Sequence, residues 1–179
     1  AVFALVMVAL AGCASGPRSD PRDPWEPLNR KVWDFNEAVD DAILKPVAST
    51  YKEVVPTLVR KGVNNFFANL GDAWSFVNNV LQLKPLGAVE SLTRFNVNTI
   101  LGVGGLFDVA SEMNIDRHKE DFGQTLGRWG VRSGPYMVLP ILGPSTARDT
   151  AAMFVDSQGN LLDGVEHIPT RNSATFLKM

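Results

Sequence analysis

Residues 57–70 read Thr57-Leu-Val-Arg-Lys-Gly-Val-Asn-Asn-Phe-Phe-Ala-Asn-Leu70, a stretch in which apolar side chains recur at steps of three and four. The members of this stripe are Leu58, Val59, Gly62, Val63, Phe66, Phe67 and Leu70. Such spacing puts them on one face of an amphipathic helix. Gly71 and Asp72 come next, and we expect them to end this helix and to cap the following one.

Similar spacing on both sides predicts three more helices. Upstream, apolar residues recur over residues 28–43 with charged residues on the other faces, and Pro46 is expected to stop that helix. Downstream, one helix fits residues 73–83 and another fits residues 86–101. No alternating pattern of strand length stands out before residue 130. The short apolar stretch Tyr136–Leu139 is compatible with a strand or with extended chain, so the sequence predicts an α-rich fold.

The composition fits one folded domain with appendages. The chain has 179 residues, of which 45% are apolar, and this is ample for one core. Its formal net charge is -2, with acidic and basic residues interspersed. A nucleic-acid-binding surface would need an excess of Lys and Arg on one face, so we expect no nucleic acid partner.

The first twelve residues have the character of a signal-peptide core. Residues 1–12 carry no charge, and they are too few to cross a bilayer as a mature helix. The chain begins with Ala1 rather than Met, and no basic residues precede the apolar run. We therefore assign residues 1–12 to a signal peptide and expect its start to be missing.

The apolar run ends in Leu10-Ala11-Gly12-Cys13, which resembles the bacterial lipobox. Small residues let the peptidase approach the backbone, and the Cys13 sulfur is the nucleophile that takes the diacylglyceryl group. We therefore expect cleavage between Gly12 and Cys13 and lipidation of Cys13. The alternative is an ordinary buried cysteine, but Cys13 is the only cysteine and lies just where the apolar run ends.

Residues 13–23 are expected to form a lipidated anchor followed by a flexible tether. Residues 14–23 are polar and rich in Pro, Gly and Ser. Ten such residues reach at most about 35 Å when extended, so the body stays close to the bilayer. Several acyl chains on one residue exceed the marginal affinity of a single chain, so anchoring is expected to be stable. Ala14 rather than aspartate follows the cysteine, which favours the outer membrane by resemblance to the sorting rule of enterobacteria.

No local motif supports catalysis or a metal site. Residues 102–108 contain three glycines, but the last glycine of a dinucleotide loop would fall at Phe107. The two histidines, His118 and His167, lack the spacing of a metal site. The segment around Ser145 lacks the glycine that a nucleophile elbow needs two positions later. We therefore expect no catalytic residue, no metal and no cofactor, and we expect that the protein is not an enzyme.

The apolar helix faces leave two placements open. No run of eighteen apolar residues follows the signal, so none of the helices is expected to span a membrane. The faces then either pack against one another in a water-soluble core or sink into the interface of a bilayer. Periodicity alone does not separate these alternatives, because any surface helix shows the same stripe.

Several blocks of sequence in one order resemble the MlaA/VacJ family of lipoproteins. The blocks are Asp23-Pro24-Trp25-Glu26-Pro27-Leu28-Asn29-Arg30 with Phe35-Asn36, Asn69-Leu70 with Val77-Asn78-Asn79 and Leu81-Gln82, Arg94-Phe95 with Asn98-Thr99, Asp121-Phe122-Gly123-Gln124-Thr125-Leu126-Gly127 with Trp129-Gly130, and Gly134-Pro135-Tyr136 through Arg148-Asp149. Their order and spacing both fit, and they cover nearly all of residues 23–160. The resemblance makes residues 24–179 a family-like helical domain, whose C-terminal end we expect to be truncated.

The resemblance implies an all-α fold, a ring of short amphipathic helices that lies in the inner leaflet of the outer membrane, with a central polar channel. It also implies a lipid-anchored protein on the periplasmic side of that membrane in a Gram-negative bacterium. Members of the family associate with trimeric porins and pass mislocalised phospholipids from the outer leaflet to a periplasmic lipid carrier, which maintains lipid asymmetry. The expected partners are therefore phospholipids, a porin, the carrier and the inner leaflet.

A set of polar residues in these blocks is the candidate lining of the channel, because a charged headgroup needs a polar path through hydrocarbon. The candidates for channel or headgroup contacts are Asn29, Arg30, Asn36, Asn78, Asn79, Arg94 and Asn98. The alternative for these residues is helix capping and hydrogen bonding between helices. A second alternative concerns the whole protein: a non-transporting envelope scaffold that binds porins would share every feature except transport.

Overall fold

The computed structural model describes residue 20 and residues 22–159. The described chain divides into two compact units. The first contains residues up to 53 together with residues 132–150, and the second contains residues 54–131 together with residues from 151 onward. The expected signal peptide, the expected cleavage site at Gly12 and Cys13, and most of the tether lie outside the described residues.

Helices make up most of the described chain, which confirms the prediction of an α-rich fold. Two short strands form a single sheet within residues 22–159. In those same ranges, none of the helices is long and apolar enough to cross a membrane.

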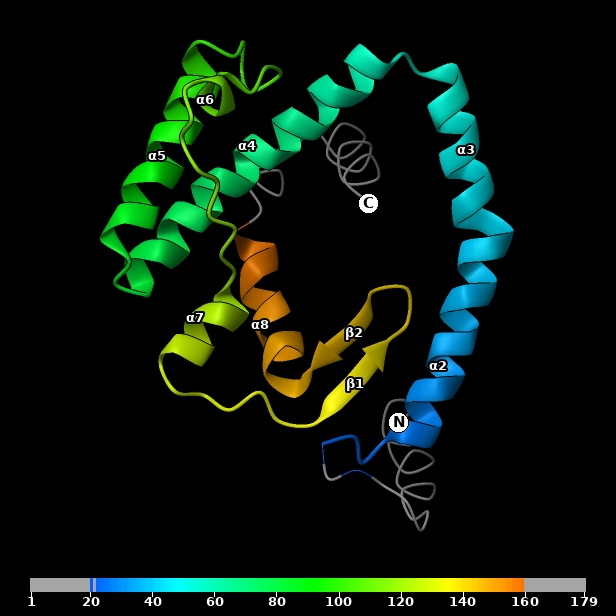
Figure 1. Ribbon diagram of the computed structural model, residues 1–179. Helices are drawn as coiled ribbons and strands as arrows, with labels where there is room; N and C mark the ends of the chain where they lie inside the picture. Colours follow the sequence, from blue (N-terminus) through cyan, green and yellow to red (C-terminus); the bar gives the residue numbers. More distant parts are fainter. Residues whose placement is uncertain (1–19, 21, 160–179) are drawn as a thin grey trace. The chain divides into compact units, whose positions relative to one another are not determined.

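The first unit contains a long helical segment with a π-helical turn in its middle (Figure 1). α2 spans Glu26–Val39, the π-helix η2 spans Asp40–Leu44, and α3 spans Lys45–Val54. The expectation that Pro46 stops this helix is wrong. Pro46 has no N–H to bond to the preceding turn, and in the π turn the N–H of Lys45 reaches back five residues to the carbonyl of Asp40. Pro46 thus lies in the first turn of α3, where helices tolerate proline.

A β-hairpin packs against α2 in the same unit. β1 spans Tyr136–Leu139 and pairs antiparallel with β2, which spans Gly143–Thr146. The apolar stretch that the sequence left open is therefore a strand. Ile141, in the turn between the strands, and Gly143, the first residue of β2, have positive φ values of 68° and 83°. α8, Ala147–Gln158, follows β2 directly and continues from the first unit into the second.

The second unit is built on α4, a continuous helix of 25 residues that spans Thr57–Leu81. The expectation that Gly71 ends one helix and Asp72 caps the next is wrong. The side chain of Asp72 is buried and forms ion pairs with Arg94 and Arg117. The carboxylate of Asp72 therefore pairs with two distant arginines instead of capping a helix. The helix then runs through Gly71 at the cost of about 1 kcal/mol of intrinsic propensity.

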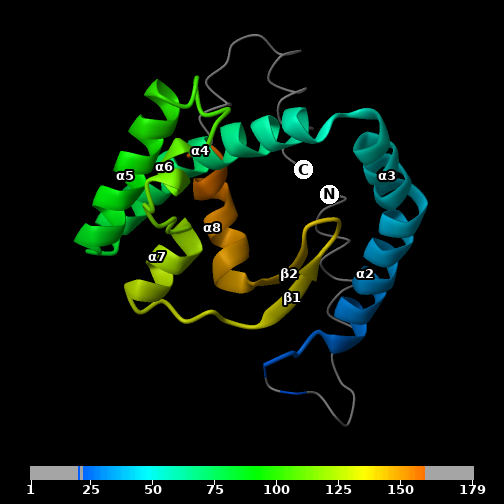
Figure 2. The ribbon, with the colours of Figure 1, turned by 45° about the horizontal axis from the view of Figure 1, so that its top comes forward.

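α5 spans Pro85–Ile100 and confirms the helix predicted over residues 86–101. It returns along α4, and the two helices lie side by side in both views (Figures 1 and 2). α6, Val109–Glu112, packs on α5, and α7, Phe122–Arg128, contacts α4. The side chains of Asp108 and Asp121 cap these two short helices by accepting hydrogen bonds from backbone N–H groups of their first turns.

Candidate functional site

Among the described residues, most of the buried side chains are polar, and many large apolar side chains are exposed. Among the described residues, the buried hydrophobic side chains are three alanines and one valine. The buried polar side chains are Asn29, Asn69, Asp72, Ser75, Asn78, Asn79, Gln82, Ser91, Arg94, Asn98 and Thr125. Meanwhile Leu58, Leu83 and Phe154 are 81%, 85% and 77% exposed. Water-soluble proteins bury their large apolar side chains, so this distribution is inverted.

The interface between α4 and α5 follows a polar and small-residue seam. On α5, the buried positions Gly87, Ser91, Arg94 and Asn98 recur at steps of four, three and four. On α4, the buried positions include Asn69, Asp72, Ser75 and Asn79, again at steps of three and four, and the series continues to Gln82 just after the helix. Helices that associate in lipid use small residues and interhelical hydrogen bonds in this way, because hydrocarbon gives them no hydrophobic reason to pair.

A cluster of four charged side chains lies at the seam; Asp72 and Arg94 are buried, and Asp108 and Arg117 are half-buried. Arg94 donates to Asp108 over 2.7 Å, donates to the carbonyl of Ile115, and lies 3.4 Å from Asp72. Arg117 lies 3.0 Å from Asp72 and 3.5 Å from Asp108. Two guanidinium groups thus face two carboxylates, and the cluster carries no net charge.

Asn98 completes this cluster from the next turn of α5. Its Nδ2 donates to Asp108 over 3.0 Å, and its Oδ1 accepts from the N–H of Ala110 over 2.9 Å. Both halves of its amide are therefore used to hold the segment that follows α5. We call the set Asp72, Arg94, Asn98, Asp108 and Arg117 the buried charge cluster.

Burial and neighbouring charges act in opposite directions on the two carboxylates. Burial raises the pKa of Asp72 above its ordinary value, although Arg117 and Arg94 pull it down. Burial also acts to raise the pKa of Asp108, but hydrogen bonds from Ser111 and Asn98 and the nearby guanidinium groups outweigh it. The pKa of Asp108 is therefore held below its ordinary value.

A second polar network joins the end of α4 to α7. Thr125 donates to Oδ1 of Asn78 over 2.7 Å and accepts from Nε2 of Gln82 over 3.1 Å. Gln82 also donates to Glu120 over 2.9 Å. Asn79 donates to the carbonyl of Ser75 over 2.9 Å, within its own helix. Thr125, Asn78 and Gln82 are thus bonded to one another, whereas Oδ1 of Asn79 is buried without a hydrogen-bond partner.

The surface of the α4–α5 hairpin is almost free of unpaired charge. Between residues 62 and 107 the charged residues are Asp72, Lys84, Glu90 and Arg94. Two of them belong to the buried charge cluster. Lys84 pairs with Glu120 over 2.8 Å, and Glu90 lies 2.5 Å from Nε2 of His118. From residue 62 onward the hairpin therefore presents apolar side chains outward while its charges face partners; Arg60 and Lys61 lie before this stretch, in the first turns of α4.

In the first unit, two asparagines of α2 hold the hairpin. Oδ1 of Asn29 accepts from the N–H of Val138 over 2.8 Å, and its Nδ2 donates to the carbonyl of Tyr136 over 3.3 Å. Seven residues later, Asn36 donates to the carbonyl of Leu139 over 3.0 Å and accepts from the N–H of Ile141 over 2.7 Å. Each amide thus replaces the backbone of a neighbouring strand and satisfies the open edge of β1.

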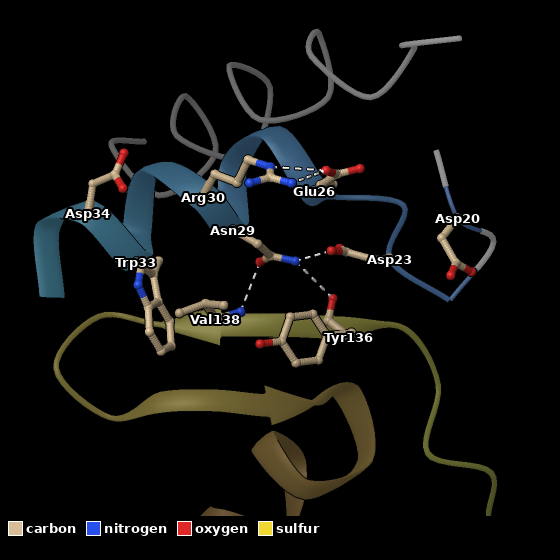
Figure 3. Close-up of a pocket in the computed structure, with 9 residues that line it drawn as sticks. All are labelled: Asp20, Asp23, Glu26, Asn29, Arg30, Trp33, Asp34, Tyr136 and Val138. Atoms are coloured by element: carbon tan, nitrogen blue, oxygen red, sulfur yellow. Dashed lines mark hydrogen bonds and ion pairs between the residues drawn. The ribbon is translucent and has the colours of Figure 1, made fainter. Parts of the chain in front are cut away.

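A pocket of about 600 Å³ lies between the start of α2 and β1 (Figure 3). Its lining residues are Asp20, Asp23, Glu26, Asn29, Arg30, Trp33, Asp34, Tyr136 and Val138. Asn29 donates to Asp23 over 2.6 Å, and Arg30 donates to Glu26 over 2.7 Å. Four carboxylates against one guanidinium make the lining negative, which favours cationic groups over anionic ones.

The structure separates the seven polar residues proposed from the sequence into three groups. Asn78, Asn79, Arg94 and Asn98 are buried in the second unit, where their hydrogen bonds run within and between helices. Asn29 and Asn36 hold the hairpin of the first unit. Arg30 is exposed, and its guanidinium pairs with Glu26 on the helix surface. The contacts of the first two groups are those of the alternative reading, hydrogen bonding between elements, and a contact with lipid headgroups stays a prediction.

Sequence reasoning missed part of the interior. Asp72 was expected to be a cap, while Asn69, Gln82 and Thr125 were quoted only as parts of family blocks. A signal was present, because the polar residues of α4 recur at helical spacing on the face opposite the apolar stripe. The sequence analysis left open which face of this helix is buried. Within the described ranges, no group of His, Cys, Asp and Glu side chains is arranged to hold a metal ion.

Comparisons with known proteins agree with this picture. A sequence model described as MlaA lipoprotein matches residues 21–179. An uncharacterized protein of Rickettsia typhi is 45% identical over 127 residues, covering 71% of this chain and 51% of that relative. The intermembrane phospholipid transport system lipoprotein MlaA of Escherichia coli is 39% identical over 160 residues, covering 86% of this chain and 64% of that protein. This chain thus spans between about half and just under two thirds of these relatives.

A solved structure described as the structural basis for maintenance of bacterial outer membrane lipid asymmetry has a similar fold. It matches with a TM-score of 0.75 and 36% sequence identity, and the match covers 89% of this chain and 82% of that one. The family match includes nearly every described residue, and the inverted interior lies inside it. The chain belongs to the MlaA lipoprotein family.

Proposed function

We propose that this protein is the lipid-anchored outer-membrane component of an intermembrane phospholipid transport system. It removes mislocalised phospholipids from the outer leaflet and passes them along a polar channel toward a periplasmic lipid carrier, which maintains the lipid asymmetry of the membrane. The observation that carries this proposal is the inverted distribution of side chains, with a polar interior and an apolar surface.

The exposed apolar surface favours a lipid environment. Each square ångström of apolar surface left in water costs about 25 cal/mol, and monomeric soluble proteins rarely expose large contiguous apolar patches. Large side chains are exposed along both α4 and α5, among them Leu58, Val80, Leu86 and Val89. Because none of the described helices is suited to cross a membrane, these helices fit a position in the interface, in the inner leaflet of the outer membrane.

The polar interior supports a role with charged lipid headgroups. An isolated charge in hydrocarbon costs several kcal/mol or more, so a protein that moves headgroups must offer polar partners. Of the seven polar residues proposed from the sequence, Arg30 is the best candidate for direct headgroup contact, because its side chain is accessible. The buried residues Asn78, Asn79, Arg94 and Asn98 would act indirectly, by keeping the helices together.

The proposal includes an anchor and partners. Acylation of Cys13 would hold the body on the periplasmic side of the membrane by a tether of about ten residues, which extends to about 35 Å at most. A trimeric porin and a periplasmic lipid carrier are the proposed protein partners. The protein would move lipid without changing a covalent bond, so we propose that it is not an enzyme.

The second candidate is an envelope scaffold that binds porins without moving lipid. It shares the anchor and the apolar surface, and an exposed apolar surface also fits a porin wall. The two candidates differ in one measurable quantity, the amount of phospholipid in the outer leaflet.

The test compares cells that lack the protein with cells that carry the full-length protein or its Cys13→Ser variant. Transport predicts that outer-leaflet phospholipid accumulates without the protein and that only the acylatable form restores the normal amount. If neither loss nor rescue changes the amount, while the protein still copurifies with a porin, the scaffold replaces the transporter.

A further inference from the structure

The pocket at the start of α2 carries both signs of charge and an apolar wall (Figure 3). Its volume of about 600 Å³ lies within the range of small-molecule sites, about 300–1,000 Å³. Val138 and Trp33, which is 47% exposed, supply the apolar lining. Arg30 supplies the guanidinium group, and four residues supply carboxylates. Such a lining can receive a small polar group that itself carries both charges.

The guanidinium group of Arg30 is oriented by a neighbour and keeps free donors. Its Nε and Nη2 both donate to Oε1 of Glu26, over 3.0 and 2.7 Å. Its Nη1 has no hydrogen-bond partner among the described residues, and the side chain is 75% exposed. The hydrogen bond with Glu26 and, more weakly, the charges of Asp23 and Asp34 raise the pKa of Arg30. A guanidinium with free N–H donors is well suited to a phosphate group.

Two carboxylates of the pocket lack a cationic partner. Asp34 lies one helical turn beyond Arg30, but Arg30 pairs with Glu26 on its other side, so Asp34 has no ion pair in the ranges that the structure describes. Asp23 accepts only from the neutral amide of Asn29, over 2.6 Å. Residues four positions apart on a helix lie about 5–6 Å from each other. A fixed cation and an unpaired carboxylate are therefore neighbours at the wall of the pocket.

We propose that this pocket binds the phosphoethanolamine group of a phospholipid, so that the protein prefers a zwitterionic lipid to anionic phosphatidylglycerol. The phosphate accepts from Arg30, and the ammonium, two carbon atoms beyond, donates to Asp34 beside the ring of Trp33. The unpaired charges of Asp23 and Asp34 disfavour a headgroup that brings no cation. This inference rests on the proposed function, and it adds which headgroup is preferred.

The experiment measures which lipid the full-length acylated protein retains in a non-ionic detergent. Native mass spectrometry counts bound phosphatidylethanolamine and phosphatidylglycerol, offered in equal amounts and with the same acyl chains. The variants are Asp34→Asn and Asp34→Lys. Glu37→Gln is the matched control, because Glu37 is an exposed carboxylate of α2 outside the lining of the pocket.

The unsubstituted protein should retain phosphatidylethanolamine over phosphatidylglycerol by about tenfold. Asp34→Asn should lower this ratio by about fivefold, the upper range for an exposed ion pair, and Asp34→Lys should lower it further. Glu37→Gln should leave the ratio unchanged. Equal ratios for Asp34→Asn and Glu37→Gln would rule out the pocket as the site that selects the headgroup.

Glycerophosphoethanolamine has the same headgroup without acyl chains, and it separates a lipid ligand from a soluble one. In large excess it should displace the bound lipid, whereas glycerophosphoglycerol should not. Displacement already at equimolar amounts would make a soluble phosphate ester the ligand and overturn the lipid assignment. If the unsubstituted protein binds both lipids equally, the headgroup preference is wrong but the proposed function stands, since outer-leaflet phospholipid in complemented cells tests that function separately.

Discussion

The Nη2 atom of Arg94 donates a hydrogen bond to Oδ1 of Asp108 over 2.7 Å, which ties the middle of α5 to the residue that caps the start of α6. The same guanidinium also faces Asp72 on α4. One side chain therefore connects two helices and the segment after them. Because Arg94 is fully buried, water cannot take the place of a lost partner of its guanidinium.

Arg94→Gln should destabilise the second unit strongly. The substitution leaves Asp72 and Asp108 with Arg117 as their only cationic partner, and breaking a buried pair costs about 3–5 kcal/mol. The measurement is the free energy of unfolding of the acylated protein in detergent micelles. Lys61→Gln, at an exposed residue with no ion pair among the described residues, is the control. Equal stability of the two variants would show that the buried charge cluster does not hold the fold.

Acid should weaken the same cluster through Asp108. Its pKa in the folded protein lies below the ordinary value of 3.8, so the native state binds a proton less readily than the unfolded state. The stabilisation is fully present above pH 3.8 and is lost as the pH falls through the lower folded-state pKa. Asp108→Asn should therefore be less stable near neutral pH and lose less stability between pH 4 and pH 2. Parallel unfolding curves for the two proteins over this range would contradict the assignment.

Asn29 and Asn36 of α2 hold the β-hairpin by hydrogen bonds to its backbone, and we call these contacts the asparagine clamp. Asn36→Ala leaves the carbonyl of Leu139 and the N–H of Ile141 without partners, which costs about 1–3 kcal/mol. Hydrogen exchange of peptides that cover residues 136–146 should accelerate by about tenfold or more. Asn36→Asp keeps the acceptor for Ile141 and loses the donor, so its effect at Ile141 should be smaller. Asn64→Ala, at an exposed residue, serves as the control, and equal exchange in all three variants would rule out the clamp.

The helices were predictable from sequence because the apolar stripes repeat at helical spacing regardless of what covers them. The side that is buried was not predictable, since a stripe such as Leu58 and Val59 looks the same in a soluble core and at a lipid surface. Only coordinates show that Asn69 and Asp72, on the opposite face, are the buried ones.

Two predicted helix boundaries were wrong, because distant contacts and a shifted hydrogen-bond pattern outweighed the local sequence signals. Asp72 is a good capping residue by itself, but its partner Arg94 lies 22 positions away in the sequence. Pro46 is a good terminator by itself, but the π turn before it lets the helix continue. The polar residues chosen from family blocks were brought together only in part: Arg94 and Asn98 meet at Asp108, whereas Arg30 stays on the surface.

Two glycines of the α4–α5 hairpin should respond in opposite directions to the same substitution. Gly71 lies inside α4 with nothing within 4 Å of an added Cβ, so Gly71→Ala should stabilise the protein by about 0.5–1 kcal/mol through helix propensity. At Gly87 an added Cβ would lie 2.4 Å from Oδ1 of Asn79 across the seam. Gly87→Ala should therefore destabilise it by about 1–3 kcal/mol, because either the buried side chain of Asn79 or the two helices must shift.

Thermal unfolding of both glycine variants in the same detergent measures the difference directly. The pair controls for helix propensity, since each variant replaces a helical glycine by alanine. A stabilising Gly87→Ala would mean that α5 does not approach α4 closely at this point, and the polar seam would lose its packing role. A destabilising Gly71→Ala would mean that the outer face of α4 is already occupied, which would argue against free contact of that face with lipid.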